Sequence, residues 1–146
     1  MQVFKKATFH LVSTVEYIDE RGLSEAEADK SDTRVTGTFR VEGDEITLSY
    51  TEKQSGAEVF TRIRVLEDSV VLERRGSIDA VMIFKEGEGY QSIYSVPPYQ
   101  FDMNLYTRKI DNGLSHAGGD LTLVYDAEVG GSKTACRMKI GVSLEK

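Results

Sequence analysis

The chain has 146 residues, of which 40% are hydrophobic and 29% are charged, and its formal net charge is −6 at pH 7. This acidity argues against nucleic acid or an anionic membrane surface as a partner, because both favour a basic protein face. No apolar run approaches the roughly 18–20 residues of a membrane span. The length predicts one domain over residues 1–146.

Two features of the sequence predict a cytoplasmic protein. The lysines near Met1 are not followed by the apolar stretch of a secretory signal. Cys136 is the only cysteine, so no internal disulfide can form, which is typical of proteins in a reducing compartment.

The first predicted element is a strand over residues 5–18, where side-chain character alternates with a period of two. The next segment, residues 19–33, is rich in acids and poor in apolar residues, which predicts a solvated loop. Inside it, Ser24 and Glu27 match a capping box, so a short helix is the alternative interpretation there.

From residue 35 onward the same alternation recurs in short segments separated by turns, most of which contain glycine. Further strands are expected at residues 35–41, 46–50, 59–65, 70–74, 78–84, 90–96, 101–106, 121–129 and 134–144. Pro97 and Pro98 cannot lie inside a central strand and therefore mark a corner.

About ten strands without a predicted long helix must form two packed sheets or curl into a barrel. Nearly every connection is a hairpin, whereas a Greek-key sandwich needs longer crossing connections. We therefore predict an all-β fold, an antiparallel up-and-down (meander) barrel of about ten strands. Pairing of the last strand with the first would remove two exposed edges.

Two parts of the sequence carry a family resemblance. The first is residues 74–77 (RRGS) followed by residues 82–84 (MIF) and Gly87, and the second is residues 94–99 (YSVPPY) with residues 105–107 (LYT). Together they resemble the DUF1934 family, and the likeness covers nearly the whole chain. The resemblance implies a calycin-like, lipocalin-type β-barrel in a bacterial cytoplasmic protein. It supplies no catalytic residues.

Residue types suited to catalysis or metal binding are scarce. His10 is expected in a strand and His116 in a glycine-rich loop, and no ligands follow the spacing of a zinc site. Cys136 is predicted to pack as a small hydrophobic side chain. Gly87 and Gly89 lack the third glycine and the helix of a phosphate-binding loop. We therefore predict no enzyme activity, no metal and no cofactor.

Arg74 is the most unusual residue of the predicted barrel. It shares a strand face with the apolar Val70 and Leu72, so its side chain should point inward. An interior guanidinium needs a partner, because an unpaired buried charge is costly. One interpretation places it at the barrel mouth, reaching water or an internal carboxylate. The other makes it the anchor of an anionic ligand group.

Other large side chains on candidate inward faces complete a predicted ligand-binding set. Tyrosines suit a cavity of mixed polarity, but they can also fill the core and bond to the backbone. The set comprises Arg74, Tyr50, Tyr94, Tyr125, Met82, Phe101 and Met103.

Two functions remain open from the sequence. The first is a protein that binds a small apolar or amphipathic ligand inside the barrel. The alternative is a non-catalytic protein-interaction or regulatory module whose barrel is filled by side chains. Its candidate surfaces are the segment 19–33 and the outward arginines Arg62 and Arg64. The oligomeric state is not predicted.

Overall fold

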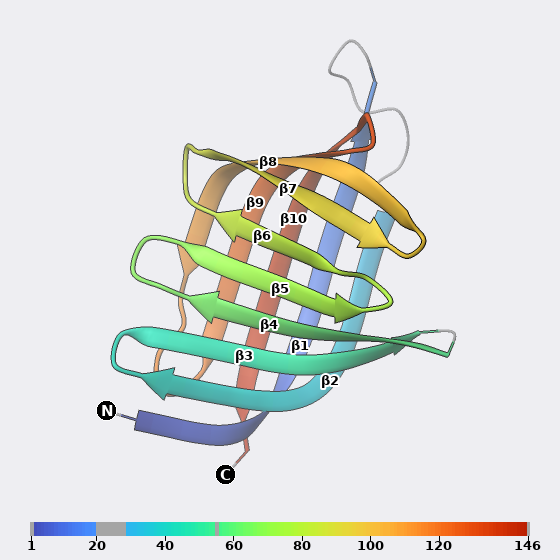
Figure 1. Ribbon diagram of the computed structural model, residues 1–146. Helices are drawn as coiled ribbons and strands as arrows, with labels where there is room; N and C mark the ends of the chain where they lie inside the picture. Colours follow the sequence, from blue (N-terminus) through green and yellow to red (C-terminus); the bar gives the residue numbers. More distant parts are fainter. Residues whose placement is uncertain (1, 20–28, 55, 146) are drawn as a thin grey trace.

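A computed structural model describes residues 2–19, 29–54 and 56–145. It contains ten strands in one sheet (Figure 1). These are β1 (Gln2–Ile18), β2 (Asp29–Glu42), β3 (Glu45–Gln54), β4 (Ala57–Val65), β5 (Val70–Gly76), β6 (Ala80–Phe84), β7 (Gly89–Val96), β8 (Tyr99–Asn112), β9 (Gly119–Val129) and β10 (Ser132–Leu144). Within the described residues, no helix is long and apolar enough to cross a membrane.

The strands follow one another in an antiparallel meander that closes through the first and last strands. The order across the sheet is β6-β5-β4-β3-β2-β1-β10-β9-β8-β7, and β1 pairs with β10 from Ala7↔Leu144 to Ile18↔Lys133. The two sheet edges, β6 and β7, meet at a bridge in which the backbone amides of Asp79 and Ser95 each donate to the other residue's carbonyl, at 2.8 and 2.9 Å. The predicted up-and-down barrel is therefore confirmed, with a seam between β6 and β7.

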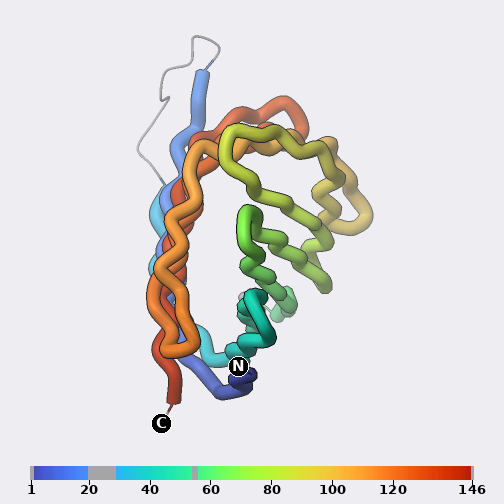
Figure 2. The backbone as a smooth tube through the Cα atoms, turned by 90° about the vertical axis from the view of Figure 1, so that its left-hand side faces the viewer, coloured from blue at the N-terminus to red at the C-terminus, as the bar shows by residue number. Residues whose placement is uncertain are grey.

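The barrel is flattened, with two walls that face each other across the interior (Figure 2). β1, β8, β9 and β10 run along one wall, while β3 to β6 cross in front of them at a steep angle (Figure 1). We call the end where β3 joins β4, β5 joins β6, β7 joins β8 and β9 joins β10 the mouth. The opposite end, where β1 begins and β10 finishes, is the closed end.

Large apolar side chains fill the interior toward the closed end. They come from inward positions that alternate along each strand, and Phe9, Phe39 and Phe84 are fully buried among them. Leu48, Ile63, Leu72, Leu121, Leu123 and Ile140 are also 0% exposed. This part of the barrel is a packed core.

The second strand departs from the sequence-based expectation. Residues 19–33 were predicted to form a loop, but residues 29–33 belong to β2 and pair with β1, from Leu11↔Thr33 to Val15↔Asp29. Most of these residues are exposed, so burial gives no alternating signal, and pairing with the long β1 is what holds them extended. The alternative of a short helix at Ser24 and Glu27 lies outside the described residues.

Other strand ends also differ from the predicted bounds. β1 begins at Gln2, three residues before the predicted start, and β8 continues to Asn112 past a register shift between Thr107 and Lys109. A shift of this kind lets a long strand bend with its wall while pairing continues. The corner predicted at Pro97 and Pro98 separates β7 from β8, and the bond between the two prolines is cis.

We predict that Gly37→Ala destabilises the protein by about 2–4 kcal/mol. A Cβ at Gly37 would overlap the Ser49 carbonyl oxygen of β3 and lie 2.9 Å from Cε2 of the buried Phe9. Gly89→Ala is the matched control, since its Cβ would meet only the Leu105 carbonyl oxygen, at 3.4 Å. Urea denaturation of both variants measures the effect. Equal free energies of unfolding for the two variants would contradict the prediction.

Candidate functional site

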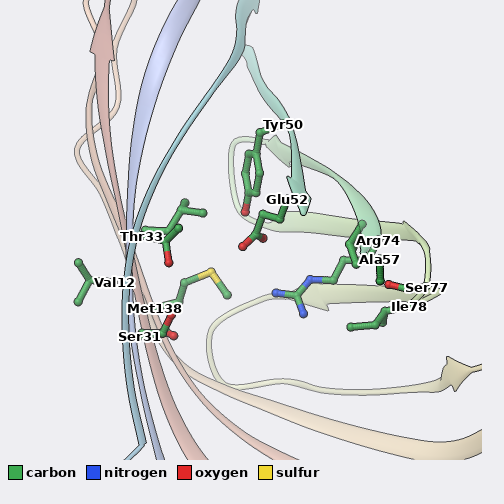
Figure 3. A pocket seen from close by; sticks show the side chains of 13 residues that line it. Val12, Ser31, Thr33, Tyr50, Glu52, Ala57, Arg74, Ser77, Ile78 and Met138 are labelled. Atoms are coloured by element: carbon green, nitrogen blue, oxygen red, sulfur yellow. The ribbon is translucent and has the colours of Figure 1, made fainter. Parts of the chain in front are cut away.

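The mouth holds a cavity of about 370 Å³ between the two walls, which we call the mouth cavity (Figure 3). Leu11, Val59 and Met138 contribute apolar surface to it from β1, β4 and β10. Polar side chains enter it from both walls, including Ser31 of β2 and Arg74 of β5. The lining is therefore mixed, with an apolar part and a few fixed polar groups, as is common for small-molecule sites.

Arg74 projects its guanidinium into the mouth cavity (Figure 3). Val70 and Leu72 precede it on the same face of β5 and are buried, and Arg74 is the last inward residue before the turn at Gly76. Its Nε is buried and has no hydrogen-bond partner within the described chain. An unsatisfied buried donor costs about 1–3 kcal/mol, so this nitrogen of the guanidinium lowers the stability of the fold.

Tyr50, Thr61 and Arg74 form one row across β3, β4 and β5, through the pairs Tyr50↔Thr61 and Thr61↔Arg74. Tyr50 is 4% exposed, and Thr61 beside it is fully buried. Burial raises the pKa of the Tyr50 hydroxyl to about 12; the charge of Glu52 adds to this, and that of Arg74 opposes it. The hydroxyl therefore stays neutral at physiological pH and can donate or accept a hydrogen bond.

Glu52 brings a negative charge to the same cavity. It follows Tyr50 by two residues on β3, so both side chains lie on the inner face. Figure 3 shows its carboxylate close to the hydroxyl end of Tyr50. Glu52 is half-buried, and the described residues give it no ion pair with Arg74. One cation and one anion thus share the cavity without neutralising each other by contact.

Some of the seven predicted site residues line the mouth cavity, and the others lie elsewhere. Only Arg74 and Tyr50 line the mouth cavity. Met82 and Met103 are 6% and 2% exposed and belong to the packed core, and Tyr94 packs against that core without lining the cavity. Their candidate ligand-binding role is therefore not supported by position.

Tyr125 also fills the core. It is 8% exposed, and its ring meets Phe84 edge-on at 4.8 Å between centroids. Desolvation by this burial raises the pKa of its hydroxyl well above the ordinary value. The ring therefore occupies interior volume that a ligand would otherwise need.

The expectation that Phe101 lies in the interior is wrong. It has the same strand parity as Met103, but it is 41% exposed because it stands near the start of β8, at the mouth. Figure 2 shows the hairpin formed by β7 and β8 on the side of the barrel away from β1 and β10. Strand parity assigns a side to each residue, and the position along the strand decides whether that side is covered.

Sequence reasoning missed Glu52 and Ser31. A signal existed for Glu52, since a charged residue two positions after an inward tyrosine is as unusual as Arg74. Ser31 gave no signal, because it lies in the segment that was predicted to be a loop.

Comparison with known proteins supports the fold and the family. The model of the family described as "Domain of unknown function (DUF1934)" matches residues 16–140. The chain belongs to this family. It is similar to the "Uncharacterized beta-barrel protein YwiB" of Bacillus subtilis (strain 168), with 27% identity over 97 residues, covering 66% of this chain and 68% of the relative.

The similarity to a DUF1934 relative extends to the three-dimensional fold. A crystal structure of the ywiB protein from Bacillus subtilis superposes with a TM-score of 0.84 at 22% sequence identity, covering 98% of this chain and 94% of the other. The resemblance found in the sequence and the barrel architecture are therefore confirmed. At this identity the likeness concerns the fold, so the site must be understood from the residues of this chain.

We predict that Tyr50→Phe weakens the loss of stability at high pH. In the folded protein burial raises the pKa of Tyr50 to about 12, whereas in the unfolded chain the hydroxyl ionises near the ordinary tyrosine pKa of about 10. The unfolded state loses the proton first, so the free energy of unfolding falls as pH rises from about 10 toward 12, by roughly 2–3 kcal/mol for this group. The phenylalanine variant lacks this part of the slope.

Urea denaturation at a series of pH values from about 8 to about 12 measures the slope. Tyr125, whose pKa is also raised by burial, leaves a residual slope in the Tyr50 variant. Tyr99→Phe, at a side chain that is 66% exposed, is the control. A Tyr50 variant with the same pH dependence as the wild type would refute the assignment of a buried, neutral hydroxyl.

Proposed function

We propose that this DUF1934 barrel binds a small amphipathic molecule at its mouth. The polar end of the ligand would contact Arg74, and its apolar part would lie against Leu11, Val59 and Met138. The observation that carries the proposal is the Arg74 side chain, which enters a cavity with a buried Nε that no described residue satisfies. A ligand carboxylate, phosphate or sulfonate would supply acceptors in the planar geometry that a guanidinium favours.

The size of the cavity supports a small ligand. At about 370 Å³ the mouth cavity is near the lower end of the range of about 300–1,000 Å³ that is usual for ligand sites. The packed core below it limits how deep a ligand could reach. A short or medium-length molecule therefore fits better than a long lipid chain.

The proposal is for binding without catalysis. Among the described residues that line the mouth cavity there is no histidine and no cysteine, so its serines have no imidazole beside them to act as a base. The alternative, an interaction module with a barrel filled by side chains, agrees with the closed end. An open mouth whose arginine has a buried Nε without a partner among the described residues favours the ligand-binding function.

We also propose that the protein acts in the cytoplasm without nucleic acid or membrane partners. A single cysteine that forms no internal disulfide is typical of reducing compartments. The net charge of −6 disfavours polyanionic partners.

The binding role of Arg74 predicts that Arg74→Gln weakens binding of the apolar anion anilinonaphthalene sulfonate by about tenfold or more, because the sulfonate loses a charged, desolvated partner. Fluorescence titration of the dye measures the affinity. Arg75→Gln is the matched control, since Arg75 is the next residue of β5, has a 67% exposed side chain and contacts Glu73 at 3.5 Å. Equal affinities for wild type and Arg74→Gln, or a dye that does not bind the wild type, would overturn the proposed function.

If Arg74 serves ligand binding and not the stability of the barrel, Arg74→Met should raise the free energy of unfolding by about 1–2 kcal/mol. Methionine keeps most of the side-chain length and removes the buried Nε, which has no hydrogen-bond partner among the described residues. Arg75→Met should stay within about 0.5 kcal/mol of the wild type. Urea denaturation at neutral pH checks both variants. If Arg74→Met were clearly destabilised, the arginine would be a structural residue of the barrel.

A further inference from the structure

Arg74 and Glu52 are two opposite charges that line the mouth cavity at separate points. Arg74 stands in the row Tyr50–Thr61–Arg74, while Glu52 stands in the next row toward the rim, through the pairs Glu52↔Val59 and Val59↔Gly76. Arg74 on β5 and Glu52 on β3 are two strands apart and are offset by two residues along the strand direction. Standard strand geometry therefore puts their Cα atoms about 12 Å apart. Both side chains nevertheless enter the same cavity, and no ion pair within 4.0 Å joins them among the described residues.

The Tyr50 hydroxyl lies on the Glu52 side of the cavity (Figure 3). Besides burial, which is the largest cause, Glu52 raises the pKa of Tyr50 and Arg74 lowers it, so both charges act on one hydroxyl. Figure 3 shows the Tyr50 hydroxyl and the Glu52 carboxylate on one side of the cavity and the guanidinium approaching from the other. The cavity therefore has a positive pole at Arg74 and a negative pole at Glu52, and the neutral hydroxyl beside the negative pole can bond to a ligand.

This pair of poles limits which ligands fit. The charged lining residues sum to zero, so a simple anion that reaches Arg74 also meets the field of Glu52. That repulsion offsets part of what the arginine contributes. A molecule with a cationic group on the side of Glu52 gains from both poles, because its charge distribution is complementary to that of the cavity.

The facing wall agrees with a ligand that is polar at more than one point. Ser31 and Thr33 of β2 point toward the same space from the opposite wall (Figure 3). Their hydroxyls can donate to an anionic group or accept from an ammonium group. Met138 lies near them and supplies apolar surface for a short spacer between the two charged ends of the ligand.

We infer that the ligand is zwitterionic, with an anionic group held by Arg74 and a cationic group held by Glu52 at the two ends of a short apolar spacer. This inference rests on the proposed function and deepens it by naming the chemical class of the ligand. It assigns to Glu52 a specificity-determining contact with the cationic end.

Three compounds with the same six-carbon skeleton test the inference: hexanoate, hexylammonium and ε-aminohexanoate. Chemical-shift titration in two-dimensional amide NMR spectra measures their affinities, which suits weak binding by small probes. We expect the wild type to bind ε-aminohexanoate about fivefold or more tightly than either singly charged compound. This comparison needs no variant.

Two isosteric variants, Glu52→Gln and Arg74→Gln, test which residue binds which charged end of the ligand. The Glu52→Gln variant should bind hexanoate more tightly than the wild type does, because the Glu52 carboxylate no longer repels this anion. Its preference for ε-aminohexanoate should vanish, because the ammonium group of that ligand loses its negative partner. The Arg74→Gln variant should bind hexanoate and ε-aminohexanoate more weakly than the wild type does, while its affinity for hexylammonium should be unchanged. Glu58→Gln and Arg75→Gln, at side chains that are 62% and 67% exposed, are the matched controls.

Each result has a distinct meaning. If hexanoate binds the wild type as tightly as ε-aminohexanoate, and Arg74→Gln weakens both, the zwitterion is overturned and the proposed anion-binding function stands. If the affinities for hexanoate and ε-aminohexanoate are the same in Arg74→Gln as in the wild type, the proposed function fails as well. If none of the three compounds binds at millimolar concentration, the inference is overturned, and the dye titration decides the proposed function separately.

Discussion

Pairing of β1 on both of its sides holds the barrel together. β1 pairs with β2 from Gln2↔Glu42 to Val15↔Asp29 and with β10 from Ala7↔Leu144 to Ile18↔Lys133. Without the second of these ladders the long strands β1 and β10 would each become an unpaired sheet edge, and the meander would not enclose an interior. Because the two ladders run nearly the whole length of β1, they also extend one wall past the packed core and so give the barrel a mouth.

The two halves of the interior have opposite physical demands. At the closed end, Phe39, Phe84 and their neighbours fill the space and supply most of the apolar burial. At the mouth, Arg74 leaves a donor unsatisfied, which lowers stability by an amount that a domain of this size can tolerate when its core is well packed. Such a residue is expected where binding, and not folding, determines the side chain.

The sequence predicted the strands and their order because alternation and glycine turns are local signals. It placed Arg74 and Tyr50 correctly on the inner face, since that depends only on parity. It could not separate them from Tyr125 or Phe101, because depth inside a barrel depends on strand tilt and on registers between distant segments. Residues 29–33 of β2 were not predicted as strand for a related reason, because their extended conformation comes from pairing with β1 and not from their own apolar pattern.

The turn after Arg74 explains how a single arginine can act as a fixed anchor. The Ser77 amide donates to the Glu58 carbonyl at 3.1 Å, and the Gly76 amide donates to an Asp79 carboxylate oxygen at 3.2 Å. Asp79 in turn forms the backbone bridge to Ser95 that closes the seam. The backbone beside Arg74 is thus tied to β4, β6 and β7 at once, so a ligand need not order it on binding. The contacts that close the barrel therefore also fix the position of the positive pole, while Glu52, on the far side of β4, is positioned by the ladder between β3 and β4.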